Sequence, residues 1–176
     1  MRNRLCAFFL LLATPLPLQA ANNSAHIELI IFRQGDMQAR YDSKVAPDNW
    51  AADSQHLQPS QLRSSLLENP VSKLVPANGY SILLHRTWQQ DAANGTVRVA
   101  LSSGDEVFGH HPVEGTLTLE QDQSNKVTLD FWINQFKADG NLQRSERLLQ
   151  SMSVPYNELT YIDYGDLGAL VRIQPQ

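Results

Sequence analysis

Cysteine is almost absent from the 176-residue sequence, and so are long apolar runs. The one cysteine, Cys6, lies inside the one long apolar run, residues 5–13. Arg2 and Arg4 flank its start, and prolines and then Ala20-Ala21 follow it. A short positive segment, an apolar stretch and small residues, in that order, are typical of a secretory signal peptide. We therefore expect residues 1–20 to be a signal peptide that is cleaved near Ala20 or Ala21.

Loss of this segment leaves a mature chain without cysteine. That excludes disulfides, thiol catalysis and thiolate metal sites. The apolar run is also shorter than the roughly 20 residues that span a bilayer, so we expect no transmembrane anchor. A mature chain of roughly 150 residues can bury a sufficient core without cross-links. We expect one domain, residues 26–176, that acts outside the cytoplasm.

Positive charge is scarce as well. The full chain has 14 Lys and Arg against 18 Asp and Glu. Without Arg2 and Arg4 the balance is 12 against 18, a net charge of −6 for the mature form. No basic block or basic helix pattern is present, so nucleic acid and anionic membrane surfaces are poor partners.

Catalytic signatures are missing from the chain. It contains no G-x-S-x-G, S-x-x-K or H-E-x-x-H motif, one of which a penicillin-binding enzyme or a zinc amidase should carry. The adjacent pair His110-His111 is the one metal-like cluster. Neighbouring side chains of an extended chain point in opposite directions, so we expect a solvated loop there and no metal or other cofactor.

Alternation of apolar and polar residues predicts strands along most of the mature chain. Residues 26–33 are apolar on both faces, which is typical of a central strand. In residues 126–136, Val127, Leu129, Phe131 and Ile133 should point inward. Asn94-Gly95 and Asp139-Gly140 predict hairpin turns. The other predicted strands are residues 80–89, 96–101, 113–120, 141–152 and 167–173.

Helical spacing is confined to residues 60–69, where Leu62, Leu66 and Leu67 recur before Pro70. The sequence therefore predicts an α+β domain. Its core would be a mostly antiparallel sheet of about six strands, with one or two helices covering one face.

Aromatic residues supply the candidate binding sites. Trp132 lies on the polar face of its predicted strand, where it is either covered by other structure or an exposed platform for a sugar ring. Trp88 should share a strand face with Tyr80, opposite to His85. Packing in the core is the simpler role for Trp88, and a hydrogen-bonded packing role is the simpler one for His85.

A second group of candidates lies near the C-terminus. Tyr161 and Tyr164 cluster with Asp163 in a segment that we expect to connect strands, where binding residues are often found. The alternative is that the tyrosines fix the geometry of a turn.

Four stretches stand out in chain order: residues 27–32 (IELIIF), 78–90 (NGYSILLHRTWQQ), 113–117 (VEGTL) and 158–163 (ELTYID). Together they resemble the CsiV family, the cell-shape-integrity peptidoglycan-binding proteins of Gram-negative bacteria. Residues 78–90 are similar to the family pattern G-Y-x-V-L-x-H-x-x-W-x-Q, and the other three stretches resemble further family segments. Departures mark the chain as a divergent member: Thr160 stands where the pattern has His, and Tyr164-Gly165 stand where it has His-Pro. The pattern's Arg-Arg-Met-Arg run corresponds to residues 149–152, LQSM.

The resemblance implies a non-enzymatic periplasmic protein that binds peptidoglycan and assists cell-wall assembly. It also implies contact with an outer-membrane lipoprotein that activates a penicillin-binding synthase. Two alternatives remain from the residues. One is a periplasmic protein–protein adaptor without glycan binding, and the other is a cell-wall hydrolase that pairs Asp163 with Glu158 or Asp166.

Overall fold

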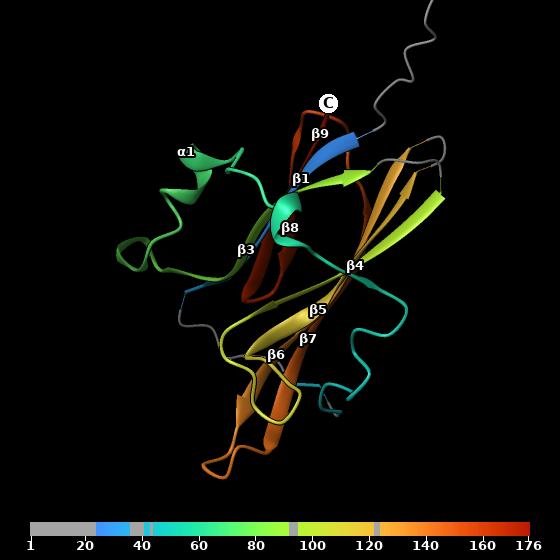
Figure 1. Ribbon diagram of the computed structural model, residues 1–176. Coiled ribbons are helices and arrows are strands. Elements are labelled where there is room, and N and C mark those ends of the chain that lie inside the picture. The colour runs from blue at the N-terminus through green and yellow to red at the C-terminus, as the bar shows by residue number, and fades with distance from the viewer. Residues whose placement is uncertain (1–23, 36–40, 43, 92–94, 122–123) are drawn as a thin grey trace, which may run out of the picture.

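Two β-sheets packed face to face form the protein, as seen in the computed structural model of Figure 1. The structure describes residues 24–35, 41–42, 44–91, 95–121 and 124–176. The predicted signal peptide and Asn94 lie outside this part of the chain. Within it the strands are β1 Ser24–Gln34, β2 Gln55–His56, β3 Tyr80–Asp91, β4 Gly95–Ser103, β5 Val113–Gln121, β6 Asn125–Phe136, β7 Leu142–Ser153, β8 Leu159–Tyr164 and β9 Leu167–Pro175.

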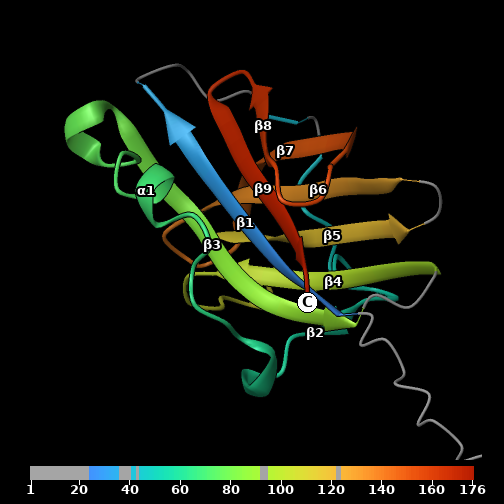
Figure 2. The same cartoon turned by 90° about the horizontal axis from the view of Figure 1, so that it is seen from above.

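Neighbouring strands define the two layers. The first sheet has the order β3-β1-β9-β8 and the second the order β2-β4-β5-β6-β7. Every pairing is antiparallel except the short one between β2 and β4. The strands of the two layers cross at an angle in Figure 2. Among the described residues no helix has the length and hydropathy that a membrane-spanning segment needs.

The main core lies between the sheets. Ile27, Leu29 and Ile31 of β1 face Leu129 and Phe131 of β6 across it, and all five are buried. Burial of each such side chain contributes about 1.5–3 kcal/mol. The predicted alternation in these two strands is therefore confirmed, as is the central position of β1 in its sheet.

A smaller core covers the outer face of the first sheet. Ile30 and Phe32 of β1 pack there with Leu170 of β9 and Leu67. Leu67 comes from the irregular segment 57–79, whose only helical turns are η1 Pro59–Gln61, α1 Glu68–Val71 and η2 Pro76–Asn78. In Figure 1 this segment lies on the side of β1 and β3 that faces away from the second sheet.

The predicted fold class was wrong. In place of an α+β domain with about six strands and covering helices, the described residues form nine strands in two sheets, with short helical turns only. Alternation predicted strands at most of the right places, but it could not show that they divide into two layers that cover each other. A sheet that is covered by a second sheet needs no helices.

A contact with β1 explains why the predicted helix at residues 60–69 is absent. The carboxylate of Glu28, fully buried on the outer face of β1, accepts hydrogen bonds from the backbone N–H of Leu66 and the hydroxyl of Ser65. That N–H is therefore not available to a helix, and residues 62–67, between η1 and α1, form no helix. Leu62, which should have faced the core, is exposed.

A β-bulge in β3 changes which residues share a face. Ile31 pairs with Leu84 and Phe32 with Ile82, so Leu83 is an extra residue in β3. Tyr80 consequently lies on the outer face, whereas Trp88 lies in the main core. The prediction that these two aromatics share a face was wrong, because strict alternation does not survive a bulge.

β7 and β8 are each the last strand of their sheet. β8 lies in the segment that was expected to be connecting structure, so that prediction was wrong. Arg33 of β1 ties the sheets together, because its guanidinium pairs with Glu146 of β7 and with Asp166 before β9.

Candidate functional site

Two hollows flank β8, one on each side of the strand. We name the first the outer groove; it lies on the outer face of the first sheet and encloses about 430 Å³. We name the second the edge cleft; it lies between β7 and the end of β8 and encloses about 410 Å³. The outer groove is lined by Phe32, Gln34, Asn69, Pro70, Lys73, Leu74, Tyr80, Leu159, Tyr161 and Leu170.

Three aromatic rings shape the outer groove. Phe32 is buried in its floor, and Tyr80 meets that ring edge-on, with centroids 5.7 Å apart and planes at 77°. Tyr161 stacks on Phe32 with centroids 6.4 Å apart and planes at 25°. Since Tyr161 is 52% exposed, one aromatic surface of the stack is open to solvent. Such a surface suits the apolar face of a sugar or another flat group.

Polar groups line the rim of the outer groove. The Tyr161 hydroxyl donates to Gln34 Oε1 at 3.4 Å, and Gln34 Nε2 donates to the Gly165 carbonyl at 3.1 Å. The amide of Asn69 and the ammonium of Lys73 are exposed on the opposite wall. An aromatic surface with amides and one cation beside it can hold a polar ligand that carries a carboxylate.

His85 does not line the outer groove, but it contacts Glu28, which holds one of the groove's walls. Its Nε2 donates to Glu28 Oε1 at 2.6 Å, and Glu28 in turn holds Ser65 and Leu66. These contacts fix the segment that carries Asn69 and Lys73. His85 therefore positions one wall of the outer groove and does not line it.

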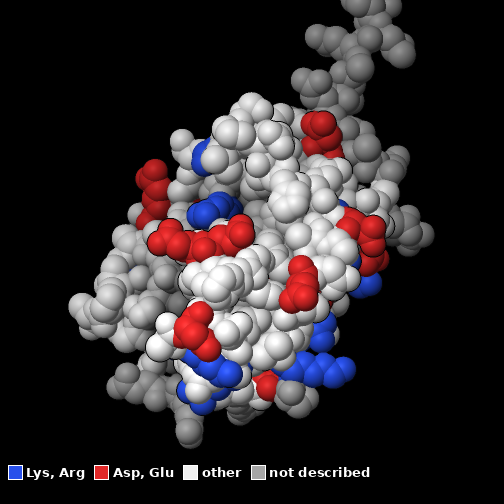
Figure 3. Space-filling model, turned by 60° about the horizontal axis from the view of Figure 1, so that its bottom comes forward, with Lys and Arg blue, Asp and Glu red and all other residues white. Residues whose placement is uncertain are grey.

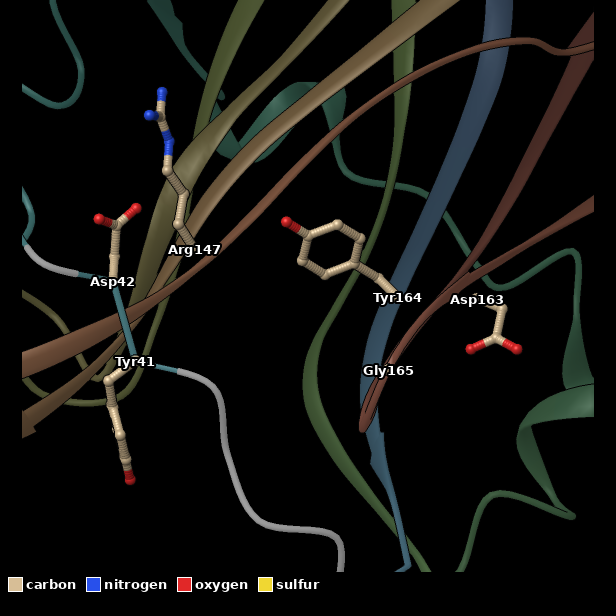
Figure 4. A pocket seen from close by; sticks show the side chains of 6 residues that line it. All are labelled: Tyr41, Asp42, Arg147, Asp163, Tyr164 and Gly165. Atoms are coloured by element: carbon tan, nitrogen blue, oxygen red, sulfur yellow. The ribbon is translucent and has the colours of Figure 1, made fainter.

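The edge cleft is the more polar of the two hollows. It is lined by Tyr41, Asp42, Arg147, Asp163, Tyr164 and Gly165. Figure 4 shows the Tyr164 side chain directed toward Arg147, whereas Asp163 points to the other side of the strand. The carboxylate of Asp130 accepts two hydrogen bonds from Arg147, at 2.8 and 3.0 Å, and raises the pKa of that guanidinium. Arg147 is thus already engaged by the protein.

The structure does not gather the six candidate residues in one groove. Tyr161 lines the outer groove, while Asp163 and Tyr164 line the edge cleft. Trp88 is fully buried in the main core. Trp132 is 6% exposed, with the Arg147 guanidinium 4.8 Å from its ring centroid, so it forms no open platform.

Sequence reasoning missed Phe32, Tyr80 and Lys73 as residues of the groove. Phe32 lies in a strand that is apolar on both faces, so it was indistinguishable from a core residue. The bulge at Leu83 moved Tyr80 to the outer face. Lys73 follows the expected helix, and no pattern connected it with Tyr161 far along the chain.

His110 belongs to a buried hydrogen-bond network on the outer face of the second sheet. Its Nδ1 lies 2.7 Å from Glu114 Oε1 and its Nε2 lies 3.2 Å from Asp48 Oδ1. Burial lowers the pKa of the imidazole, but the hydrogen bonds to both carboxylates outweigh it, so the pKa is raised. The expectation of a solvated loop was wrong for His110, which is buried. In the described part of the chain no three His, Cys, Asp or Glu side chains converge as a metal site would require.

The carboxylates that the hydrolase alternative would pair lie in different surroundings, with Asp163 lining the edge cleft. Asp166 is buried and its carboxylate pairs with Arg33. Glu158 is exposed just before β8.

Acidic and basic side chains are interspersed on the face seen in Figure 3, without one broad basic patch.

Comparison with known proteins identifies the family. The family model described as "Peptidoglycan-binding protein, CsiV" matches residues 49–176. This range contains the stretches 78–90, 113–117 and 158–163, and it begins after β1. No curated protein and no solved structure matches the chain. Because the match extends from the loop before β2 to the last residue, the chain belongs to the CsiV family of peptidoglycan-binding proteins.

Proposed function

We propose that this protein is a non-enzymatic, periplasmic peptidoglycan-binding protein that assists cell-wall assembly, and that the outer groove holds its ligand. Membership of the CsiV family supports peptidoglycan as the ligand. The observation that carries the choice of site is the exposed ring of Tyr161 stacked on Phe32 in a groove with amide and ammonium groups on its rim.

The glycan strand is the part of peptidoglycan that fits this groove. A pyranose ring has an apolar face that can stack on Tyr161, while its hydroxyl and acetamido groups can bond to Gln34 and Asn69. Muramic acid also carries a lactyl group. Its carboxyl group is a free carboxylate where no stem peptide is attached. Lys73 supplies a cation for such a group.

Sedimentation with isolated sacculi tests the function. We expect the purified mature protein to sediment with sacculi well above the level of an unrelated exported protein of similar charge. Background retention would refute peptidoglycan binding. Incubation with sacculi, followed by mass spectrometry of the soluble products, tests the non-enzymatic part; release of muropeptides would refute it.

Separated ligands then test the choice of moiety. Peptide-free glycan strands should compete with sacculi for the protein, whereas soluble stem peptides should not. Competition by the stem peptides alone would move the site away from the outer groove and leave peptidoglycan binding intact.

The protein partner implied by the resemblance, an outer-membrane lipoprotein activator of a penicillin-binding synthase, belongs to this proposal as well. The adaptor alternative without glycan binding receives less support, because it predicted an apolar patch without a groove. A groove with mixed polar and aromatic lining is present instead.

A further inference from the structure

Phe108 occupies a backbone conformation that rarely suits a bulky residue. Phe108 and Gly109 form a two-residue turn between Val107 and His110, closed by backbone hydrogen bonds of 2.7 and 3.1 Å. Their φ angles are +50° and +84°, so the turn has the geometry of type I′. Position 108 of such a turn favours Asn, Asp or Gly, because a Cβ is crowded when φ is positive.

The same residue is also the most exposed large apolar side chain in the described residues, at 76%. Exposure of a phenyl ring to water and positive φ are both unfavourable for the isolated protein. An asparagine at this position would remove both costs. A residue that breaks two local rules without a gain in folding is a candidate for a role outside the fold.

The Phe108 ring packs against the backbone of the β6–β7 hairpin, since a Cβ at Gly140 would come within 2.8 Å of it. In Figure 1 the yellow β4–β5 loop and the orange β6–β7 hairpin meet at the lower end of the second sheet. The buried carboxylate of Glu114 accepts hydrogen bonds from the His110 ring and the His111 backbone, both at 2.7 Å. A preorganised ring loses little entropy when a partner covers it.

Acidic groups surround the turn. Asp105 and Glu106 precede it and are exposed. Asp48 is fully exposed beside His110, and Asp139 is exposed next to Gly140. Lys137 is the one cation in the neighbouring hairpin 137–140. This acidic rim opposes anionic membranes and favours a positively charged partner surface.

We propose that Phe108 anchors this protein to a partner protein, by inserting into an apolar pocket whose rim carries Lys or Arg. Large aromatic side chains that enter pockets at the centre of an interface carry much of the binding energy in protein complexes. The carboxylates of Asp105 and Glu106 would pair with the basic rim. This surface is at the lower end of the second sheet, whereas the outer groove is on the first sheet, so ligand and partner can bind together.

The test uses the full mature protein with a photoreactive benzoyl-phenylalanine at position 108, expressed in the cells that export it. A second version carries the same group at Leu149, an exposed apolar residue on β7 outside the turn. A protein that crosslinks only through position 108 is purified and titrated with unmodified protein, with Phe108→Asn and with Leu149→Asn. Crosslinking to a protein does not by itself support the proposal; the affinities measured in the titration decide.

We expect Phe108→Asn to weaken the affinity at least tenfold, while Leu149→Asn changes it less than twofold. Asp105→Asn with Glu106→Gln should weaken it further and flatten its dependence on salt. Phe108→Asn should melt no lower than the wild type and sediment with sacculi as well as the wild type, which separates this proposal from the proposed function.

Three outcomes would overturn the proposal. One is equal crosslinking from positions 108 and 149, or crosslinking only to other copies of this chain. The second is a partner affinity that Phe108→Asn leaves unchanged. The third is retention of the wild type, but not of Phe108→Asn, on vesicles of anionic phospholipid, because the ring would then insert into a membrane.

Discussion

The ring of Phe32 lies directly over Gly168, so closely that a Cβ at Gly168 would come within 2.5 Å of the ring's Cζ. The two residues are paired across β1 and β9. The missing side chain lets the ring lie flat across β9 and meet Tyr161 of β8, two strands away. Close packing of an aromatic ring on a strand glycine therefore builds the floor of the outer groove.

Gly168→Ala should disturb this floor. The added methyl must displace a ring that is packed between Tyr80 and Tyr161, so we expect a loss of about 1–3 kcal/mol in the free energy of unfolding. Sacculus binding should weaken as well. Urea denaturation and sedimentation measure the two effects. The double variant Gly168→Ala with Phe32→Leu should recover part of the stability, since the smaller side chain relieves the overlap; a neutral Gly168→Ala would contradict this account.

Tyr161→Ala tests the stacking surface directly. Aromatic stacking contributes about 0.5–1.5 kcal/mol, so the affinity for peptide-free glycan strands should fall about twofold to twelvefold. Tyr161→Phe keeps the ring and should bind nearly as the wild type does. Tyr156→Ala removes an exposed tyrosine outside the groove and is the matched control. Equal losses for the Tyr156 and Tyr161 variants would place the ligand elsewhere.

Arg33→Gln should be strongly destabilising. The carboxylates of Glu146 and Asp166 are only 3% and 2% exposed, and both pair with this guanidinium. Its loss leaves two buried charges without their cation, at a cost of about 3–5 kcal/mol. Arg147→Gln breaks a pair with Asp130 that is about one-third exposed, and should cost less than about 1 kcal/mol. Urea denaturation of both variants at neutral pH compares them, and similar midpoints would refute the role of Arg33.

The positions of most strands could be predicted from the sequence, because alternation is a local property. The placement of Ile27 and Phe131 in the main core follows from which side chains point inward in each strand. The division into two sheets could not be predicted, because it depends on which strands pair at long range. The helix at 60–69 was wrong because Glu28, more than thirty residues earlier, takes the hydrogen bonds of that segment.

The candidate site was predictable only in part. Tyr161 was a candidate because it lies in a segment near the C-terminus that was expected to connect strands, and the structure places it in the outer groove. Its partners Phe32 and Tyr80 were not found, because one resembled a core residue and the other changes face at the bulge after Ile82. Trp132 has a polar neighbourhood in sequence, but the Arg147 guanidinium lies over its ring and the side chain is buried.

His110 should make the stability of the protein depend on pH. Burial lowers the pKa of its ring, but the hydrogen bonds to Glu114 and Asp48 raise it more, so the folded pKa lies above the ordinary value of 6.5. The ring therefore binds its proton more tightly in the folded state than in the unfolded state. Its contribution is fully present below the unfolded pKa and is lost as the pH rises through the folded value.

We expect the free energy of unfolding of the wild type to fall, relative to that of His110→Gln, as the pH rises from about 5.5 to about 8.5 across this histidine's titration range. Urea denaturation at several pH values measures the difference between the two proteins. His56→Gln, which replaces an exposed histidine on β2, should keep the pH dependence of the wild type. Asp48→Asn should reduce it, because the ring then retains one carboxylate partner in place of two. A difference between wild type and His110→Gln that stays constant with pH would show that folding does not shift the pKa of this ring, and would contradict this account.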